Sequence, residues 1–216
     1  MYSYKWLGQK TVHCESMWDY GYDPKKPDDF PIVEKLWHLF NEADIIIAHN
    51  GDRFDIPKSK TRFIIHGLPP PTPYQTVDTK KIAKQFGFES NKLDELGRQL
   101  GLGRKLETGG QRLWDGCRDG DPRAWLLMKR YNKQDVVLDE QVYLKLRGWY
   151  KQHPNLGLLT RNQSCPNCQS RREHWVKNGF SYKPTGRHQR YICKVCGNTR
   201  IIGERIEMDK VFTRNA

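Results

Sequence analysis

The stretch IIIAHNGDRFD, from Ile45 to Asp55, decides the fold that we expect for this chain. It begins as an unbroken apolar run, which is typical of a strand buried on both faces in a parallel sheet. It then becomes polar and ends at Asp55, and Pro57 suits the first turn of a following helix. A carboxylate therefore stands where a strand passes into a helix, the place where open α/β sheets bind ligands. Alternatively, Asp55 is only the N-cap of that helix.

The segments around this stretch predict further strands and helices. Residues 2–14 hold two strand-like segments with a glycine-containing turn between them, which predicts a β-hairpin. Apolar residues at helical spacing predict a helix over 31–41, and a second strand is expected at 75–78. Shorter helices are expected over 57–66, 79–86 and 91–100. Residues 103–121 are rich in glycine, so we expect a loop there.

The clearest predicted helix runs from Pro122 to Arg147. Asp121 before Pro122 suits the N-cap, and Gly148 suits the stop. One stripe of this helix carries Met128, Tyr131, Asp135, Leu138, Val142 and Leu146. A carboxylate on such an apolar stripe is costly unless it is paired or binds a metal. Asp135 therefore predicts a metal ligand, with Tyr131 one turn away; the alternative is a buried salt bridge or a bond to a backbone N–H.

The cysteines predict a metal site near the C-terminus. Four of the six cysteines form two Cys-x-x-Cys pairs, Cys165 with Cys168 and Cys193 with Cys196. Four thiolates suit a structural, tetrahedral Zn²⁺ site. Disulfides are the alternative, and we expect reduced thiols because no signal peptide opens the sequence. The segment resembles a zinc ribbon, and Asn178-Gly179 between the pairs predicts a hairpin turn.

The charge of the chain favours a polyanionic partner, most simply nucleic acid. The formal net charge is +12, from 37 Lys and Arg against 25 Asp and Glu. A soluble basic surface is the alternative. From Thr160 onward there are 12 basic and 4 acidic residues, a net charge of +8, so the earlier part carries +4. No apolar run is long enough to span a bilayer, and we expect a cytoplasmic protein.

Basic and aromatic residues alternate around the cysteine pairs, a composition typical of nucleic-acid binding. The basic candidates are Arg171, Arg172, Lys177, Arg187 and Arg190, and the aromatic ones are Trp175, Phe180, Tyr182 and Tyr191. Two alternatives remain open. The aromatic residues could form the small core of the ribbon, or the ribbon could bind a protein.

Two segments resemble motifs of the DEDD exonucleases, the proofreading-type family with an RNase H-like fold. The segment from Asn50 to Asp55 resembles the second motif, and the segment from Tyr131 to Asp135 resembles the third in its Tyr-x-x-x-Asp form. The resemblance spans about residues 2–155 and looks closest to phage exonucleases associated with a DNA polymerase. It implies an α/β fold with an RNase H-like mixed sheet flanked by helices. It also implies 3′–5′ exonuclease activity on DNA beside a polymerase or another replication protein.

The same resemblance assigns roles to individual residues. Asp55 and Asp135 would bind Mg²⁺ or Mn²⁺, and Tyr131 would orient the attacking water. Asn50 and Phe54 would contact nucleic acid. Carboxylates suit this chemistry because two divalent ions neutralise the scissile phosphate and activate water.

One part of the family pattern has no counterpart in this sequence. The family carries its first motif, Asp-x-Glu, on a central first strand, whereas the opening hairpin here matches the second and third strands. We therefore expect an N-terminally truncated exonuclease, an oligomer in which another chain supplies the strand, or a relative that only binds nucleic acid or a protein. The expected domains are 1–155 for the incomplete exonuclease fold, 161–203 for the zinc ribbon and 204–216 for a tail.

Overall fold

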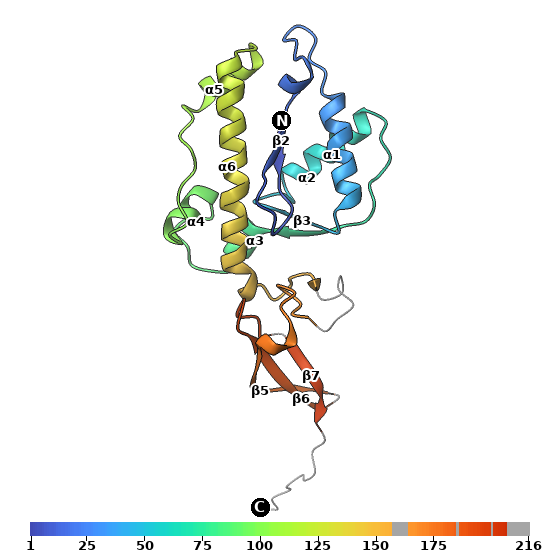
Figure 1. The fold of residues 1–216 in the computed structure, drawn as a ribbon, viewed down its shortest axis with the longest axis vertical. Coiled ribbons are helices and arrows are strands. Elements are labelled where there is room, and N and C mark those ends of the chain that lie inside the picture. The colour runs from blue at the N-terminus through green and yellow to red at the C-terminus, as the bar shows by residue number, and fades with distance from the viewer. Residues whose placement is uncertain (157–163, 185, 200, 207–216) are drawn as a thin grey trace, which may run out of the picture. The chain divides into compact units, whose positions relative to one another are not determined.

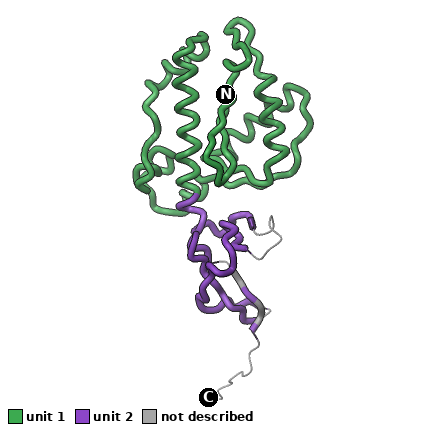
Figure 2. The backbone as a smooth tube through the Cα atoms, in the orientation of Figure 1, with its two compact units in different colours: residues 1–143 green, residues 144–216 purple. Residues whose placement is uncertain are grey.

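The computed structural model describes residues 1–156, 164–184, 186–199 and 201–206. The chain divides into two compact units, Met1–Tyr143 and Leu144–Ala216 (Figure 2). Most of the segment expected between the two domains, and the expected tail from residue 207 onward, lie outside the described residues.

The first unit opens with the predicted hairpin. β1 (Tyr2–Tyr4) pairs antiparallel with β2 (His13–Glu15). A short 3₁₀ helix, η1 (Met17–Tyr20), follows. The hairpin lies between α6 and the pair α1 and α2 in Figure 1, and the ion pair between Lys5 and Glu140 ties it to α6.

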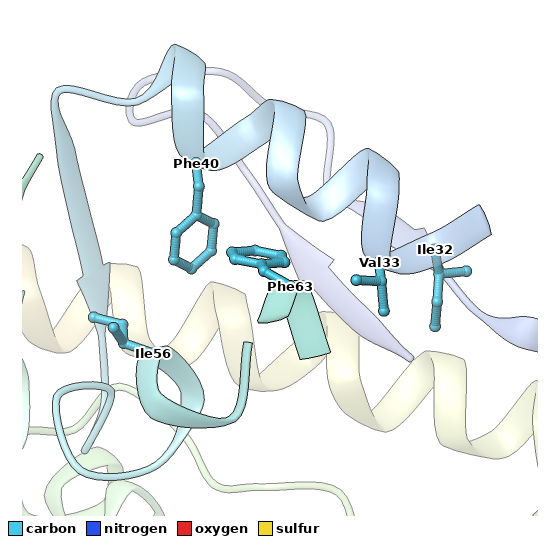
Figure 3. Packing of buried hydrophobic residues seen from close by; sticks show 5 residues of the cluster. All are labelled: Ile32, Val33, Phe40, Ile56 and Phe63. Carbon is cyan, nitrogen blue, oxygen red and sulfur yellow. The ribbon is translucent and has the colours of Figure 1, made fainter. Parts of the chain in front are cut away.

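Two of the predicted helices pack through the apolar cluster in Figure 3. α1 (Phe30–Glu42) contributes Ile32, Val33 and Phe40, and α2 (Asp55–Ile65) contributes Ile56 and Phe63. The rings of Phe40 and Phe63 meet edge to face, with centroids 5.3 Å apart at 84°. Such aromatic pairs add to the stabilisation that burial alone provides. The cluster fixes α2, and therefore its first residue Asp55, against α1.

The two predicted strands pair in parallel, as expected. β3 (Ile45–Ala48) lies beside β4 (Gln75–Asp78), with Ala48 opposite Asp78. The expectation that β3 is buried on both faces is wrong, because all four of its residues are only half-buried. Among the described strands, β3 pairs with β4 alone, so the sheet is too small to cover both faces. Both strands end at the same edge of the sheet, close to Asp55 and Asp78.

Short helices connect this sheet to α6. α3 (Thr79–Ala83) and α4 (Leu93–Gln99) are shorter than predicted. The expectation of a loop over 103–121 is wrong in its second half, where α5 (Gln111–Arg118) forms. Leu113 and Cys117 are buried one turn apart and pack with Trp125 of α6. Gly116 allows this approach, because a Cβ atom there would lie 2.8 Å from the Cβ of Ala124. Tertiary packing thus outweighs the glycine-rich composition.

The long helix is confirmed as α6 (Pro122–Leu146), followed by η2 (Arg147–Trp149). On the predicted stripe, Met128, Leu138 and Val142 are buried, while Tyr131 and Asp135 are half-buried. The stripe is therefore apolar core except at the turn that carries Tyr131 and Asp135. No helix among the described residues has the length and apolar composition that crossing a membrane requires.

The second unit contains a three-stranded antiparallel sheet in the order β5–β6–β7. Its strands are β5 (Trp175–Lys183), β6 (Gly186–Cys193) and β7 (Ile201–Ile206), and η4 (Arg172–His174) precedes them. The predicted turn at Asn178-Gly179 is wrong, because β5 continues through it as a bulge between Lys177 and Phe180. Gly179 has a φ of 66°, the left-handed conformation that a bulge places on glycine. A bulge and a turn share this requirement for glycine, which explains the misassignment.

Candidate carboxylate site and cysteine cluster

Four aspartates from three elements influence one another in the first unit. Asp55 begins α2, Asp78 ends β4, and Asp135 and Asp139 lie one turn apart on α6. Burial is the largest cause that raises the pKa of Asp139 to about 7, and the charges of the other three aspartates add to it. Asp55 and Asp135 were predicted from the sequence, and both act on the same buried carboxyl group. This end of the unit therefore favours a proton or a cation.

Asp55 is the first residue of α2, and the N-cap position belongs to Phe54, so the N-cap alternative for Asp55 is wrong. Asp55 is exposed as a residue, but partial desolvation of its carboxyl raises the pKa. Its own backbone N–H and the charge of Lys58 act in the opposite direction, while the charge of Asp78 raises the pKa further. The environment of Asp55 thus disfavours an isolated carboxylate.

Asp78, which the sequence prediction missed, holds the turn that presents Asp55. Its Oδ1 accepts hydrogen bonds from the backbone N–H groups of Lys80 and Lys81, at 3.0 and 3.2 Å, and so caps α3. The same oxygen accepts the N–H of Asn50 at 3.0 Å. Asn50 has a φ of 65°, a left-handed conformation that asparagine tolerates better than most residues. The available signal was the position of Asp78 at the carboxyl end of a parallel strand.

Asp139, also missed, belongs to a partly buried hydrogen-bonded chain. The hydroxyl oxygen of Thr79 lies 2.6 Å from Asp139 Oδ1 and 2.9 Å from His49 Nδ1, and His49 Nε2 lies 3.1 Å from the carbonyl oxygen of Asn91. Burial lowers the pKa of His49 to about 4, so the ring is neutral at physiological pH. Because a carbonyl oxygen only accepts, Nε2 carries the proton and Nδ1 accepts from Thr79. Thr79 then accepts a hydrogen bond from the Asp139 carboxyl when that group is neutral, whereas its hydroxyl donates to Asp139 Oδ1 when the carboxyl is ionised. The sequence signal for Asp139 was its position four residues after Asp135, one turn further along the same helix.

Tyr131 and Asp135 share a partner that the sequence prediction did not identify, Lys105. Its Nζ lies 2.6 Å from Asp135 Oδ2 and 2.9 Å from the Tyr131 hydroxyl. Burial lowers the pKa of Lys105, but its hydrogen bonds to Asp135 and Tyr131 outweigh that effect and raise it overall. Asp135 Oδ1 is buried and has no hydrogen-bond partner among the described residues. The salt-bridge alternative for Asp135 therefore holds for one carboxylate oxygen only.

An exposed aromatic ring stands next to Asp55. Phe54 is 50% exposed, and the Nζ of Lys58 lies 4.0 Å from the centroid of its ring. Exposed aromatic rings beside a cation are typical stacking platforms for bases of single-stranded nucleic acid. Asn50, the other predicted contact, is half-buried in the turn before Phe54.

The carboxylates form an open set of ligands. Among the described residues, the cysteines are the one group of three or more potential ligands whose atoms all lie within 4.8 Å of one another. Mg²⁺ binds through one or two carboxylates and keeps several waters, so it does not need a closed set. The unpartnered Oδ1 of Asp135 and the raised pKa of the Asp55 carboxyl fit a cation of this kind.

The four cysteines form a closed cluster in the second unit. Sγ atoms of Cys165 and Cys196 are 3.7 Å apart, as are those of Cys168 and Cys193. Four sulfurs at ~2.3 Å from a tetrahedral metal ion lie about 3.8 Å from one another. A disulfide would need ~2.05 Å, and all four cysteines are free, so the disulfide alternative is wrong. The cluster can bind a metal ion.

Hydrogen-bond donors surround these sulfurs. Ser170 Oγ lies 3.0 Å from Cys193 Sγ, and Asn198 Nδ2 lies 3.8 Å from Cys165 Sγ. Donors of this kind stabilise the thiolate form that metal binding requires. The backbone also approaches closely, because a Cβ atom at Gly148 would lie 2.0 Å from the carbonyl oxygen of Cys196. Gly148, expected only as a helix stop, is thus needed for packing beside the cluster.

The aromatic residues of the ribbon divide into two groups. Trp175 and Tyr191 pack against the cysteines, as the core alternative predicted. Phe180 and Tyr182 are 40% and 72% exposed on β5, and the guanidinium of Arg187 lies 4.6 Å from the Phe180 ring centroid. Two exposed aromatic rings, Phe180 and Tyr182, therefore remain available for the predicted contacts to nucleic acid.

The predicted basic residues differ in their freedom to contact a partner. Arg171, Arg172 and Lys177 are exposed. Arg187 and Arg190 are half-buried, and Arg190 Nε donates to the carbonyl oxygen of Asn178 in the bulge. Lys177 therefore offers the more accessible charge on the sheet itself.

Comparison with known protein families identifies the first unit. The family model described as RNase_H superfamily matches residues 16–147, which include all four aspartates and Tyr131. The chain belongs to the RNase_H superfamily. The expected RNase H-like α/β fold, followed by a small cysteine-containing β module, is thereby confirmed. A search of curated proteins found no match. The superfamily gives the first unit a nuclease-like fold.

Proposed function

We propose that this protein is a metal-dependent 3′–5′ exonuclease of the DEDD type that degrades DNA. The observation that supports the proposal is that the charges of Asp55 and Asp135, from different elements, both act on the Asp139 carboxyl within an RNase_H superfamily fold. Its resemblance to phage exonucleases supports association with a DNA polymerase or another replication protein. The free thiols of its cysteines suit a reducing, cytoplasmic setting.

Residues of the first unit supply the carboxylates, the hydroxyl and the base platform that this reaction needs. Asp55 and Asp135 would hold Mg²⁺ or Mn²⁺, which supplies charge neutralisation at the phosphate and a more acidic water. The Tyr131 hydroxyl, which now lies 2.9 Å from Lys105 Nζ, would orient the attacking water. The exposed ring of Phe54 would stack on the terminal base next to Asp55.

The second unit would add DNA affinity rather than chemistry. The four cysteines would bind a structural Zn²⁺, since four protein ligands leave no open position. Phe180 and Tyr182 offer exposed rings, and the basic residues Arg171, Arg172, Lys177, Arg187 and Arg190 offer charge to the phosphate backbone.

A second candidate function is nucleic-acid binding without catalysis. The ion pair between Lys105 and Asp135 favours it, because an ammonium already neutralises a carboxylate that catalysis would need for metal. The two separate two-stranded sheets of the first unit also suit pairing with a strand from another chain, so an oligomer could complete the site. A ribbon that binds a protein partner is the remaining alternative.

Digestion of 5′-labelled single-stranded DNA by the zinc-loaded full chain separates these functions. With Mg²⁺ or Mn²⁺ we expect a ladder that shortens from the 3′ end, is lost in Asp135→Ala and is retained in Asp115→Ala. Asp115 is a matched control because, within the described part of the chain, its side chain pairs with nearby groups on α5. DNA binding without a ladder would support the non-catalytic function. Absence of both would support the protein-binding ribbon.

A further inference from the structure

Lys105 lies in the connection between α4 and α5, and its backbone is anchored from two sides. Asp94 of α4 accepts the Lys105 N–H at 2.7 Å and the Arg104 guanidinium at 3.0 Å. Gln134 of α6 donates its side-chain amide to the carbonyl oxygen of Arg104 at 2.9 Å. Position 105 is therefore held between two helices, and its side chain is directed to the carboxylate site.

Glycines bring this connection close to the helices. A Cβ atom at Gly97 of α4 would lie 2.5 Å from the carbonyl oxygen of Gly103 and 2.9 Å from Leu138. Gly103 itself has a φ of 107°, which side chains rarely adopt. This close approach and the restricted backbone at Gly103 fix the segment before Lys105. The contact of Lys105 with Asp135 is therefore more constrained than an ion pair between two mobile surface side chains.

The Lys105 ammonium contacts both residues of the Tyr-x-x-x-Asp motif. Besides its bonds to Asp135 Oδ2 and the Tyr131 hydroxyl, Nζ lies 5.0 Å from the Tyr131 ring centroid. The Lys105 and Asp135 side chains are 28% and 22% exposed, so solvent weakens the pair only in part. An ammonium thus already neutralises, through Oδ2, the carboxylate that a metal ion would bind, while Oδ1 has no hydrogen-bond partner among the described residues.

We propose that Lys105 is an internal counter-ion that competes with a divalent metal ion for Asp135 and is released when the metal binds. This inference rests on the proposed metal site of Asp55 and Asp135. An ammonium and a divalent ion on the same carboxylate repel each other strongly in a half-buried site. The released ammonium, still anchored by its backbone, remains within reach of the phosphate that the metal ion attracts.

Mn²⁺ affinity of the zinc-loaded full chain, measured by electron paramagnetic resonance of free Mn²⁺, tests the competition. We expect Lys105→Met to bind Mn²⁺ about tenfold more tightly or better, because the competing charge is gone. Lys105→Arg and Lys133→Met should keep affinities close to the unchanged protein. Lys133 is an exposed α6 lysine for which the described residues show no ion pair, so it controls for total charge. Equal or weaker binding by Lys105→Met would overturn the inference.

A second measurement needs no substitution, so a folding defect cannot obscure it. Amine acylation of the unchanged protein, read by mass spectrometry, should modify Lys105 faster after Mn²⁺ is added, while the modification of Lys133 stays constant. Unchanged modification of Lys105 at saturating Mn²⁺ would overturn the inference.

Asp135→Ala distinguishes this inference from the proposed function. If this variant loses Mn²⁺ affinity while Lys105→Met gains none, the metal site stands and the competition fails. If neither variant changes Mn²⁺ binding, the metal site and the competition both fail.

Discussion

The two candidate metal centres of this chain differ in how far their ligands are prepared for an ion. In the cysteine cluster, four chemically identical ligands lie within 4.8 Å of one another. In the carboxylate site, the aspartates come from three elements, and Lys105 already pairs with Asp135. A closed set of ligands suits a permanent, structural ion, whereas an open and exchangeable set suits catalysis. On the proposed function, the chain would thus combine one site for stability with one site for chemistry.

The largest effect should follow loss of a cysteine. Cys193→Ser removes one of four thiolates, and the second unit, whose buried centre is the cysteine cluster, should lose its metal and unfold. Structural zinc supplies roughly 10–16 kcal/mol of folding free energy in small zinc modules. Zinc content by mass spectrometry measures the loss.

Cys14→Ser is the matched control, because Cys14 lies in β2 of the first unit, apart from the cluster. It should keep one zinc per chain. If Cys193→Ser also retains one zinc per chain, the four cysteines do not form the closed metal site on which the comparison of the two centres rests.

Removal of the Tyr131 hydroxyl tests the chemical role of the open site. Tyr131→Phe should lower the exonuclease rate by about 100-fold, the size expected when a positioned hydroxyl no longer orients water. DNA affinity and thermal stability should stay nearly constant, since the half-buried ring remains in place. An unchanged rate would show that Tyr131 only packs against Lys105.

The elements of the fold could largely be predicted from the sequence because their signals are local. The run from Ile45 to Ala48 and the capped, periodic helix from Pro122 onward each carry their own pattern. The α5 helix was missed because its stability comes from packing of Leu113 and Cys117 on α6. The bulge at Gly179 was read as a turn because both conformations require glycine there.

The two candidate sites also differ in how far the sequence alone could predict their residues. The cysteine cluster follows from two Cys-x-x-Cys spacings, so its four ligands were all predicted. At the carboxylate site, Asp55 and Asp135 stand in recognisable motifs, whereas Lys105 lies in a segment without periodicity. Its contact with Asp135 depends on anchors supplied by Asp94 and Gln134, which only the three-dimensional structure reveals.

The burial of the Asp139 carboxyl, together with the charges of the neighbouring aspartates, should appear as a pH-dependent stability. The folded pKa of Asp139 is about 7, above its ordinary value of 3.8, so the folded state holds a proton that the unfolded state releases. This contribution makes stability fall as pH rises from about 4 to 7. His49 acts oppositely, because its pKa falls to about 4 from 6.5 and stability rises over that window. Asp139→Asn should therefore be more stable than the unchanged chain at pH 8, by at most about 4 kcal/mol.

Urea unfolding at pH 4, 6 and 8 measures this difference. The gain should be largest at pH 8 and become small near pH 4, where the folded unchanged chain carries a neutral carboxyl at position 139 and the variant a neutral amide. A gain that is equal at all three pH values would contradict ionisation of Asp139 as its cause.

The smallest effect concerns the contribution of the ribbon to DNA affinity. Lys177→Ala removes one exposed charge on β5 and should reduce the slope of log affinity for single-stranded DNA against log salt concentration by about 0.7. Lys26→Ala, in an exposed turn of the first unit, should leave the slope unchanged. Fluorescence anisotropy with labelled single-stranded DNA at several salt concentrations measures both slopes. Equal slopes for the two variants would argue against ribbon contacts to phosphate.

Anomalous diffraction from crystals grown with Mn²⁺, recorded at the zinc and manganese edges, tests the two-centre account most directly. We predict a zinc peak among the four Sγ atoms and a separate manganese peak at Asp55 and Asp135, with Lys105 Nζ displaced from Asp135. A manganese peak only at the cysteines, or no manganese peak and Lys105 still paired with Asp135, would contradict the account.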